Sequence, residues 1–533
     1  MNRTYEEDLR SKNAREINLA PKSGARFNFA LVYPNFYRVG MSNLGIHIIY
    51  KILNSHKDFS CERFFLSEFN NLLSVETQTP LNKFQIIGFA VHFEPDYFNV
   101  VKMLRMGKIN PKSSLRTDFD PIIIAGGACA TFNPEPLAEI LDAFIIGEGE
   151  IILPELLEAF IESKHLTRRE KLENLSKIAG IYVPSYPKKV SRRFVKEIDE
   201  YPANSTILTD DAEFNMYLIE TARGCGRHCR FCMAGYCFRR PRNRSLDILK
   251  KQILEAKKYG KKIGLMGAAI SDYPQIDELC RFILENRLKM SVASFRADSV
   301  TFELVKSLSA SGLKTLTIAP EVGSEKMRLV VNKGITEENI FTAVELGIKA
   351  GIKNFRLYFM VGLPFEELKD VEEIANLTMR VKKYCDGRIT LSVNPFVPKP
   401  WTPFQWSAFA GKKYLDSAFK ILRGRLKSIK GVEMISESVR SSEIQAILAR
   451  GDKKISEIVL QSDNVQDFRK NFKLAGLDEE FYLGARNFDE NLPWDFLDQG
   501  FNKKYLFEEY NRAKNLKSTP KCFDGCKRCG VCS

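Results

Sequence analysis

The sequence lacks the features that would place the protein across a membrane. Its 533 residues contain no apolar run of about 18 or more, the length that favours a transmembrane helix. The stretch from Met1 to Asp8 has no apolar signal core. These absences predict a protein without a membrane span, located in a reducing cytoplasm.

The composition predicts a multidomain globular protein. Hydrophobic residues make up 44% of the chain, and its length suits about two to four domains. The 80 Lys and Arg residues exceed the 66 Asp and Glu residues, which leaves a net charge of +14. This balance favours an anionic partner such as RNA, or anionic groups on a substrate. A basic surface facing only solvent explains it equally well.

The cysteines are distributed unevenly along the chain. Seven of the twelve lie in two short clusters, at 225–232 and 522–532. Clustered C-x2-C spacing in a large chain favours metal or iron–sulfur binding over disulfides. We expect the scattered cysteines to be buried thiols; they are Cys61, Cys129, Cys237, Cys280 and Cys385.

The first cluster reads C-x3-C-x2-C, from Cys225 through Cys229 to Cys232. Three thiolates this close can converge on one metal centre. A four-iron cube normally takes four thiolates, so three would leave one iron open for another ligand. The alternative is a three-cysteine zinc site with a distant fourth ligand, and His228 lies inside the loop.

Strands and helices alternate through the N-terminal part of the chain. Apolar strands are predicted at 27–33, 84–92, 121–125 and 143–146, and helices at 46–53, 97–106 and 151–162. This order predicts a parallel, doubly wound sheet. The glycine-rich turns after the third and fourth strands fall at the strand ends where such sheets bind ligands.

The cysteine loop follows a strand that opens a second α/β domain. That strand is predicted at 217–221, and five more at 262–266, 290–295, 314–319, 354–361 and 389–394, with helices between them. Six β/α units make a partial relative of the eight-fold barrel, whose chemistry lies at the strand C-terminal ends. After the barrel, 405–500 is predicted to be helical, with a helix at 433–450.

Together these motifs resemble the radical S-adenosylmethionine (radical SAM) superfamily, in a branch with an N-terminal cobalamin-binding-type domain and a C-terminal cysteine cluster. The resemblance implies a [4Fe–4S] cluster on Cys225, Cys229 and Cys232, with S-adenosylmethionine on its open iron. It implies further cofactor-binding positions at Phe231 beside adenine, at Glu321, at Gly362 and at Arg296. Where the family usually has Gly-Gly-Glu, this chain has Gly267, Ala268 and Ala269, so the acidic group is missing.

The N-terminal part resembles the cobalamin-binding-type domain of that branch. The matching segments are 125–128, 133–136 and 142–150. The D-x-H-x-x-G signature, which supplies a histidine to cobalt, is replaced by the loop 34–40. The domain therefore either binds cobalamin without that histidine or serves as a lid. The predicted segments are 1–25 lead-in, 26–180 cobalamin-binding-like domain, 181–212 linker, 213–435 barrel, 436–517 helical region and 518–533 cysteine-rich tail.

The tail carries a second set of predicted metal ligands. It reads C-x3-C-x2-C-x2-C, through Cys522, Cys526, Cys529 and Cys532. Either an auxiliary iron–sulfur cluster or a structural zinc fits four thiolates. Residues 501–533 also hold eight basic and three acidic residues, so the tail could contact an anionic partner.

The resemblance implies reductive cleavage of S-adenosylmethionine to a 5′-deoxyadenosyl radical, which abstracts hydrogen from an unreactive carbon. The outcome would be methylation, methylthiolation or another modification of RNA, a peptide or a small metabolite. An electron donor of the flavodoxin or ferredoxin type is the implied partner. The alternative function is a non-catalytic iron–sulfur protein that binds RNA or acts as a sensor.

Overall fold

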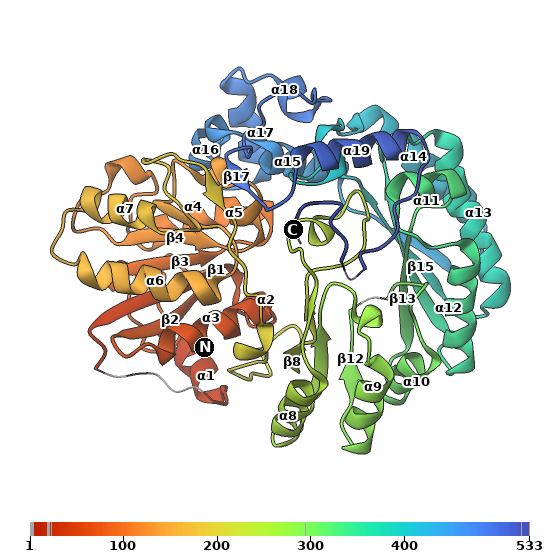
Figure 1. Cartoon of the computed structure of the whole chain (residues 1–533), viewed down its shortest axis with the longest axis horizontal. Coiled ribbons are helices and arrows are strands. Elements are labelled where there is room, and N and C mark those ends of the chain that lie inside the picture. The colour runs from red at the N-terminus through yellow and green to blue at the C-terminus, as the bar shows by residue number, and fades with distance from the viewer. Residues whose placement is uncertain (1–4, 19–21, 23, 294, 524, 532–533) are drawn as a thin grey trace. The chain divides into compact units, whose positions relative to one another are not determined.

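The computed structural model describes residues 5–18, 22, 24–293, 295–523 and 525–531 (Figure 1). The described chain forms two compact units. Unit 1 contains residues up to 216 together with 448–478 and 491–500, and unit 2 contains 217–447, 479–490 and the residues from 501 onward. The range 436–517 is therefore distributed over both units. The chain passes from one to the other within α15 (Val439–Arg450).

Unit 1 is built on one six-stranded sheet with the order β2-β1-β3-β4-β5-β6. Neighbouring strands of this sheet pair in parallel, except that β5 pairs with β6 in antiparallel. Its strands are β1 (Phe27–Phe36), β2 (Phe59–Leu66), β3 (Ile86–Ala90), β4 (Ile122–Gly126), β5 (Ala143–Ile145) and β6 (Ile181–Tyr182). The predicted doubly wound sheet is confirmed.

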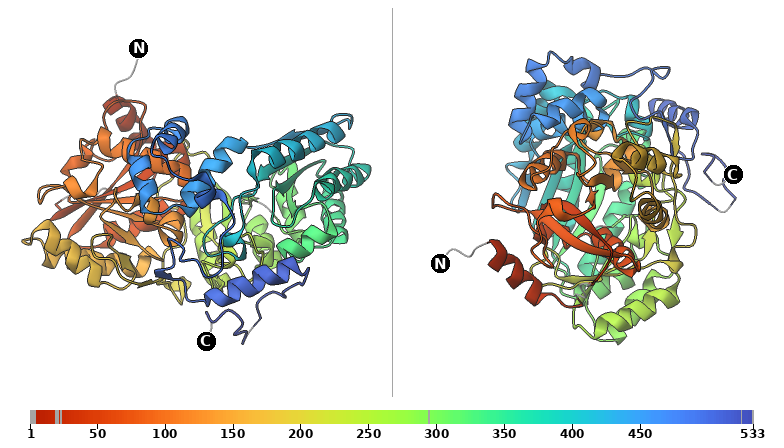
Figure 2. Two further views of the ribbon diagram at one scale, coloured as in Figure 1. Left: turned by 90° about the horizontal axis from the view of Figure 1, so that it is seen from above. Right: turned by 90° about the vertical axis from the view of Figure 1, so that its left-hand side faces the viewer.

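Helices cover the sheet of unit 1 (Figures 1 and 2). They are α1 (Tyr5–Arg15), α2 (Tyr37–Gly40), α3 (Leu44–Ser55), α4 (Tyr97–Met106), α5 (Ala128–Phe132), α6 (Gly149–Glu162) and α7 (Arg168–Lys177). From later in the chain come α16 (Lys453–Leu460), α17 (Val465–Leu474) and β17 (Leu497–Asp498), which pairs with β7 (Val190–Ser191). α3 contacts α6, whereas α4 contacts α16.

Strand β2 was not predicted from the sequence. Its FSCERFFL pattern carries Glu62 and Arg63 in the middle of the strand, which argues against a buried strand. The structure resolves the conflict, because the fully buried Arg63 guanidinium is paired with both Glu16 and Glu76. A buried charge is tolerated when it is paired and hydrogen-bonded.

Unit 2 contains two sheets, with the orders β12-β11-β8 and β13-β14-β15-β16. A parallel bridge between Phe295 and Ile318 continues the order from one sheet to the other. The strands are β8 (Met216–Glu220), β11 (Lys262–Met266), β12 (Met290–Ser291), β13 (Thr315–Glu321), β14 (Asn354–Val361), β15 (Ile389–Pro395) and β16 (Val432–Ile435). A short pair, β9 (Ala222–Arg223) and β10 (Arg242–Asn243), flanks the cysteine loop.

The helices of unit 2 alternate with these strands, as a partial β/α barrel requires (Figure 1). They are α8 (Leu246–Lys257), α9 (Ile276–Glu285), α10 (Phe302–Ala310), α11 (Glu325–Val331), α12 (Glu337–Lys349), α13 (Leu368–Tyr384) and α14 (Gly411–Leu426). Further along the chain are α18 (Glu479–Leu483) and α19 (Lys503–Lys514).

Strand β16 corrects the prediction of a helix at 433–450. Residues 432–435 pair with β15 in parallel, and Thr390 donates a hydrogen bond to Glu433 over 2.7 Å. The helix begins only at Val439. The strand is partly exposed along its length, so it lacks the apolar run by which the other barrel strands were recognised.

Burial alternates along the barrel strands and fixes which side chains face the site. In β14, Phe355, Leu357, Phe359 and Val361 are buried, and the residues between them are half-buried. Phe355 packs against α12, where it closely approaches Gly347. The half-buried set, which includes Met360, therefore points into the barrel.

None of the helices in the described ranges is long and apolar enough to span a bilayer.

Candidate functional site

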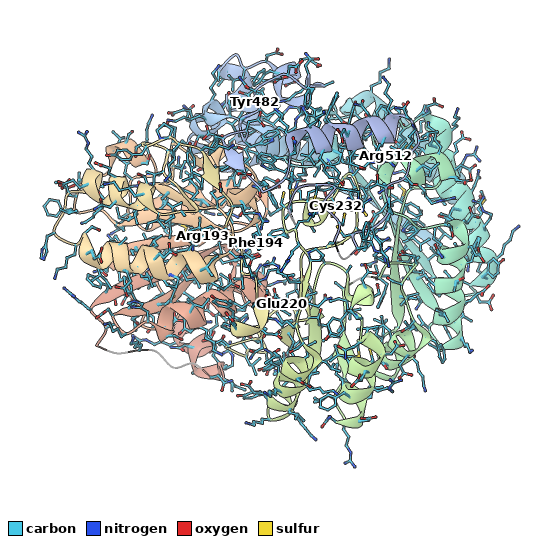
Figure 3. The ribbon with its side chains drawn as sticks, viewed as in Figure 1. Arg193, Phe194, Glu220, Cys232, Tyr482 and Arg512 are labelled. Carbon is cyan, nitrogen blue, oxygen red and sulfur yellow. The ribbon has the colours of Figure 1, made fainter. Side chains whose placement is uncertain are left out.

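The three predicted cluster cysteines lie in one loop at the C-terminal end of β8. The chain passes from β8 through β9 into this loop (Figure 3). Cys229 is buried, and Cys225 and Cys232 are half-buried. The loop is held open by backbone contacts, since Cys232 N–H donates to the Cys229 carbonyl over 3.0 Å and Arg227 N–H donates toward the Cys225 sulfur over 3.5 Å.

Burial and neighbouring sulfurs determine the acidity of the loop thiols. Burial, and then the neighbouring Cys229 and Cys225 thiols, raise the pKa of Cys232 to about 12. Burial also raises the pKa of Cys225, and the Cys229 thiol adds to this rise. Three thiolates crowded in a buried loop repel one another, and a bound cationic centre removes that repulsion.

Among the residues that the structure describes, no group of three or more His, Cys, Asp or Glu side chains is placed to hold a single metal ion. A four-iron cube spreads its thiolate ligands over a larger frame than a lone zinc does.

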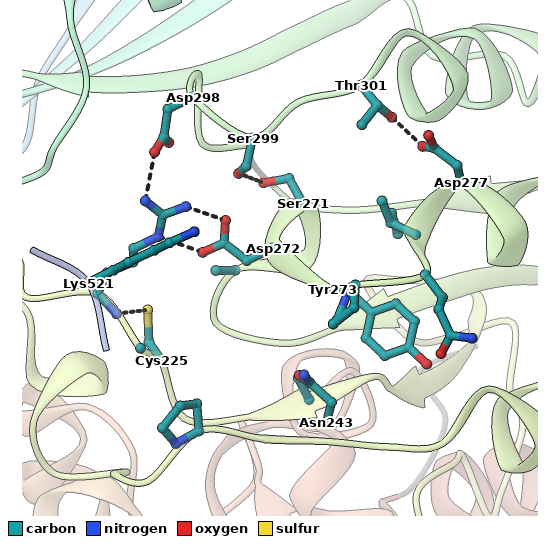
Figure 4. Close-up of a pocket in the computed structure, with 18 of the residues that line it drawn as sticks. Cys225, Asn243, Ser271, Asp272, Tyr273, Asp277, Asp298, Ser299, Thr301 and Lys521 are labelled. Carbon is teal, nitrogen blue, oxygen red and sulfur yellow. Dashed lines mark hydrogen bonds and ion pairs between the residues drawn. The ribbon is translucent and has the colours of Figure 1, made fainter. Parts of the chain in front are cut away.

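A charged cavity of about 770 Å³ opens beside the loop. Cys225 and Arg227 line it, together with the carboxylates of Asp272, Asp277, Glu278 and Asp298. Arg227 is its central cation, because its guanidinium bonds both Asp272 oxygens and one oxygen of Asp298 at 2.7–2.8 Å (Figure 4). A cavity of this volume and polarity can hold a small zwitterionic ligand.

A carboxylate lies in the segment after β11, close to the motif positions that lack an acid. Gly267 and Ala268 are exposed and Ala269 lines the cavity, but none of them carries an acid. Asp272, three residues later, points into the cavity at the end of a short 3-10 turn. Sequence reasoning missed it because the search stopped at the three motif positions. An acidic residue within one turn of the strand end was the available signal.

The motif positions after β13, β14 and β15 meet around Phe231. Phe231 and Met360 pack against an apolar cluster that includes Val322, Leu363 and Phe396. One aromatic of the cysteine loop thus packs against a cluster to which three successive strand ends contribute. This convergence is what the barrel topology predicts for residues at strand C-termini.

Two predicted cofactor residues are engaged by neighbours within the chain. Glu321, at φ +69°, is paired with Lys333. Arg296 bonds Asp298 over 3.0 Å, donates to the Lys333 carbonyl and points Nη1 at the Cys229 sulfur over 3.7 Å. Arg296 therefore adds positive charge beside the loop thiols, and the two ion pairs lie next to each other.

Close packing explains why position 362 is a glycine. Its φ of +82° favours glycine, and a Cβ there would lie 2.8 Å from the Ala410 side chain and 2.9 Å from that of Leu415. Its N–H donates to Glu366 over 2.6 Å. The close approach at this glycine is thus made by the chain itself, and a role in cofactor binding stays a prediction.

Most of the arginines around the loop are paired internally. Arg223 and Arg244 bond Glu220, Arg227 bonds Asp272 and Asp298, and the fully buried Arg230 bonds Glu509. These four arginines therefore frame the cysteine loop through ion pairs within unit 2.

The C-terminal cysteines lie against the same loop. Cys522 lines the cavity together with Cys225, and its N–H donates to the Gly226 carbonyl over 2.8 Å. Cys526 and Cys529 are buried. Cys532, the fourth predicted ligand of the tail, lies outside the described residues.

A second cavity, of about 160 Å³, lies at the C-terminal edge of the unit 1 sheet. Six glycines line it together with His92, and they are Gly45, Gly88, Gly126, Gly127, Gly147 and Gly149. At Gly127, φ is +100° and a Cβ would meet the Val91 carbonyl oxygen at 2.6 Å. Glycines thus keep the strand ends open for a narrow, flat group.

The comparisons with known proteins agree with this geometry. Residues 219–378 match the family model described as "Radical SAM superfamily", and residues 45–184 match "Radical SAM proteins, N-terminal". An uncharacterized protein of Methanocaldococcus jannaschii is 34% identical over 479 residues, 88% of this chain and 98% of the relative. The chain belongs to the radical SAM superfamily.

More distant similarity points the same way. An uncharacterized methyltransferase of Pyrococcus horikoshii is 26% identical over 47% of this chain and 56% of the relative. Among solved structures, the radical S-adenosylmethionine methyltransferase TsrM of Kitasatospora setae, with tryptophan and a SAM analogue bound, aligns with a TM-score of 0.50. The alignment covers 71% of this chain and 74% of TsrM at 15% identity, so it shows the shared fold.

Membership of the radical SAM superfamily implies a [4Fe–4S] cluster and S-adenosylmethionine as cofactors of this enzyme. The loop fits the cluster, because its three neighbouring cysteines can bind three irons of the cube and leave one iron open. The fit to cobalamin in unit 1 is partial. The glycine-lined cavity can take a narrow extension of a ligand, but it is far smaller than a whole corrinoid, and the signature histidine is absent.

Proposed function

We propose that this radical SAM enzyme cleaves S-adenosylmethionine reductively and uses the 5′-deoxyadenosyl radical to modify an unactivated carbon of a substrate. The observation that carries the proposal is the half-buried three-thiol loop at the end of β8, opening directly onto a charged cavity. When bound, a [4Fe–4S] cluster supplies one electron to S-adenosylmethionine, whose carbon–sulfur bond breaks.

The residues around the loop hold and orient the cofactors in this proposal. Cys225, Cys229 and Cys232 bind the cluster. Asp272 accepts a hydrogen bond from the methionine ammonium group, in place of the acid missing after Gly267, and its ion pair with Arg227 holds the carboxylate in the cavity. Support comes from the Arg227–Asp272 pair, whose opposite charges already lie within the cavity beside Cys225.

Phe231 and the strand-end cluster would hold the adenosine side. The partly buried Phe231 lies with Met360 next to Val322, Leu363 and Phe396, which form an apolar surface at the barrel mouth. An aromatic edge among aliphatic side chains suits a planar base and excludes water from the reacting carbon.

The substrate is proposed to be anionic, with RNA as one class and a small metabolite as another. The net charge of +14 supports this choice. The loop arginines do not add support, because Arg223, Arg227, Arg230 and Arg244 are paired with carboxylates inside the unit. Basic residues elsewhere on the surface would have to bind the phosphates. An external one-electron donor of the flavodoxin or ferredoxin type is proposed as partner.

The decisive experiment is detection of 5′-deoxyadenosine. The protein is reconstituted anaerobically with iron and sulfide, reduced, and given S-adenosylmethionine. The wild type should form 5′-deoxyadenosine, Cys229→Ala should form none, and the matched control Cys280→Ala, a buried thiol on α9, should behave as the wild type. A wild type that keeps its cluster and binds S-adenosylmethionine without product would support the sensor alternative instead.

We further propose that unit 1 binds cobalamin, with a narrow part of the cofactor in the glycine-lined cavity. The cavity and its positive-φ Gly127 and Gly147 support this assignment. Purified wild type should take up hydroxocobalamin, measured by its visible absorbance after gel filtration. Ala90→Leu, which fills the cavity, should reduce uptake while circular dichroism stays unchanged. Absence of uptake by the wild type would leave unit 1 as a lid.

A further inference from the structure

The C-terminal tail, residues 518–531, is folded onto the cysteine loop by specific contacts. Asn332 donates from its amide to the carbonyls of His228 in the loop and Thr519 in the tail, over 3.1 and 3.0 Å. The Thr519 N–H donates back to Asn332 over 2.8 Å. Cys522 N–H then reaches the Gly226 carbonyl. The tail thus occupies a defined position beside the loop.

Helix α19 contacts both the loop and the tail at the junction between them. Glu509 accepts a hydrogen bond from Thr519 over 2.7 Å and forms an ion pair with Arg230 of the loop. Arg230 also donates to the Lys517 carbonyl over 2.6 Å. One buried carboxylate therefore joins the loop and the tail to the same helix.

Each described thiol of the tail has a nitrogen donor aimed at it. His228 Nε2 lies 3.6 Å from the Cys522 sulfur, and Arg528 Nε donates to the Cys526 sulfur over 3.2 Å. Arg239 is hydrogen-bonded to Cys529. The three thiols also interact with one another, Cys522 with both Cys526 and Cys529. Three neighbouring sulfurs, each facing an N–H group, form an environment built for thiolates.

The neighbours of His228 decide which of its nitrogens carries the proton. Arg239 Nη2 lies 3.0 Å from Nδ1, and the Tyr505 hydroxyl lies 2.7 Å from the same atom. A guanidinium can only donate, so Nδ1 must accept. The proton of the neutral ring is therefore on Nε2, which faces the Cys522 sulfur. His228 is positioned as an N–H donor to sulfur, and its lone pair is not available there for a metal.

We propose that the tail holds a second iron–sulfur cluster through Cys522, Cys526 and Cys529, docked on the cysteine loop, with His228 donating a hydrogen bond to the Cys522 thiolate. A single zinc ion on the same thiols is the alternative that metal analysis separates from a cluster. Hydrogen bonds to cluster sulfurs help to set a cluster's reduction potential. His228 would thus act on the second cluster while belonging to the loop that binds the first.

Iron counting on the full-length protein tests the site. We compare the reconstituted wild type with a loop triple variant (Cys225, Cys229 and Cys232 to Ala) and a tail triple variant (Cys522, Cys526 and Cys529 to Ala). Each triple variant should hold about half the iron and sulfide of the wild type. A loop triple variant without iron–sulfur absorbance, or with zinc in its place, would overturn the proposal, as would a tail triple variant with undiminished iron.

This result does not depend on catalysis. The loop triple variant has lost the catalytic ligands, so its iron content reports on the tail whether or not the wild type cleaves S-adenosylmethionine. Circular dichroism and gel filtration identify a variant that fails to fold. In that case the single variant Cys526→Ser, which keeps the size of the side chain, should still lower the wild-type iron content, and undiminished iron would overturn the proposal.

The role of His228 is tested in the loop triple variant, where only the tail cluster is present. His228→Phe should keep the iron content and shift the midpoint potential to more negative values, because the reduced cluster loses an N–H donor. His228→Gln, whose amide can reach the position of Nε2, should restore part of the shift. An unchanged potential, or loss of iron in His228→Phe, would overturn the donor role.

Discussion

The two groups of thiols in unit 2 lie side by side but have different surroundings. In the loop, burial raises the pKa of both Cys225 and Cys232, and the neighbouring Cys229 thiol adds to each rise. In the tail, burial raises the pKa of Cys526 less than the N–H groups of Arg528 lower it, so the net shift is downward. The net pKa shift is therefore upward at Cys225 and Cys232 of the loop and downward at Cys526 of the tail.

This difference has a consequence for what each site can do. The loop sulfurs also face N–H groups, from Arg227 at Cys225 and from Arg296 at Cys229, but a cluster on three thiolates keeps one open iron, and the ligand there sets the properties of the site. A tail whose sulfurs each face an N–H group fixes the cluster environment through the protein. The comparison predicts that the loop carries the chemistry and that the tail tunes or supports it.

The largest expected effect is a difference in activity between a variant of a loop cysteine and a variant of a tail cysteine. Cys232→Ala should lower 5′-deoxyadenosine formation to the level of a reaction without enzyme, because the cluster loses one of three ligands. Cys526→Ala should reduce the yield but leave it measurable. Product is quantified by liquid chromatography and mass spectrometry. Equal loss in both variants would mean that the tail thiols are as essential as those of the loop.

The next effect concerns the carboxylate that joins both thiol groups to α19. Glu509→Gln leaves the fully buried Arg230 guanidinium without its ion-pair partner, which should cost about 3–5 kcal/mol. Urea unfolding of the metal-free protein measures the loss. The neighbouring exposed Glu508→Gln is the matched control and should change stability by less than about 0.5 kcal/mol. Similar curves for the two variants would show that the pair does not hold the junction.

A smaller and more local effect is expected at Asn332. Its φ of +48° is tolerated by Asn and by Gly, so Asn332→Gly removes only the amide that bridges His228 and Thr519. Loss of these hydrogen bonds should cost about 1–3 kcal/mol locally. Hydrogen exchange at the Thr519 amide should then accelerate about tenfold or more, while exchange in the unit 1 sheet is unchanged. No acceleration would show that the tail is held by other contacts.

Much of this arrangement was predictable from local sequence patterns. The barrel strand 354–361 and the helix 97–106 have the predicted bounds, because alternating and helical apolar periodicity is strong there. The cysteine spacing identified the loop and, with the later motifs, the family. Strand β2 was missed because its buried charge pairs with residues distant in sequence, Glu16 and Glu76.

The contacts that distinguish the two thiol groups could not be read from the sequence. His228 and Cys522 are separated by 294 positions, and their approach depends on α19 and on Asn332. The pairing of the loop arginines is likewise a tertiary property. Arg223, Arg227 and Arg230 face carboxylates, and their positions in the sequence do not show this. Local sequence patterns predict the helices and strands, whereas the partner of each charged side chain depends on the tertiary structure.

The smallest expected effect is a difference in how cluster assembly depends on pH. Thiols with a raised pKa are protonated at neutral pH and must release protons when iron binds, so assembly becomes easier as the pH rises. Cys225 and Cys232 both have raised pKa values, whereas in the tail Cys522 is raised and Cys526 lowered. Between about pH 7 and about pH 9, the initial rate of iron uptake should therefore rise more steeply in the tail triple variant, which retains the loop, than in the loop triple variant. Equal slopes would mean that the N–H donors around the tail do not change the acidity of its thiols, and the contrast between the two sites would then rest on geometry alone.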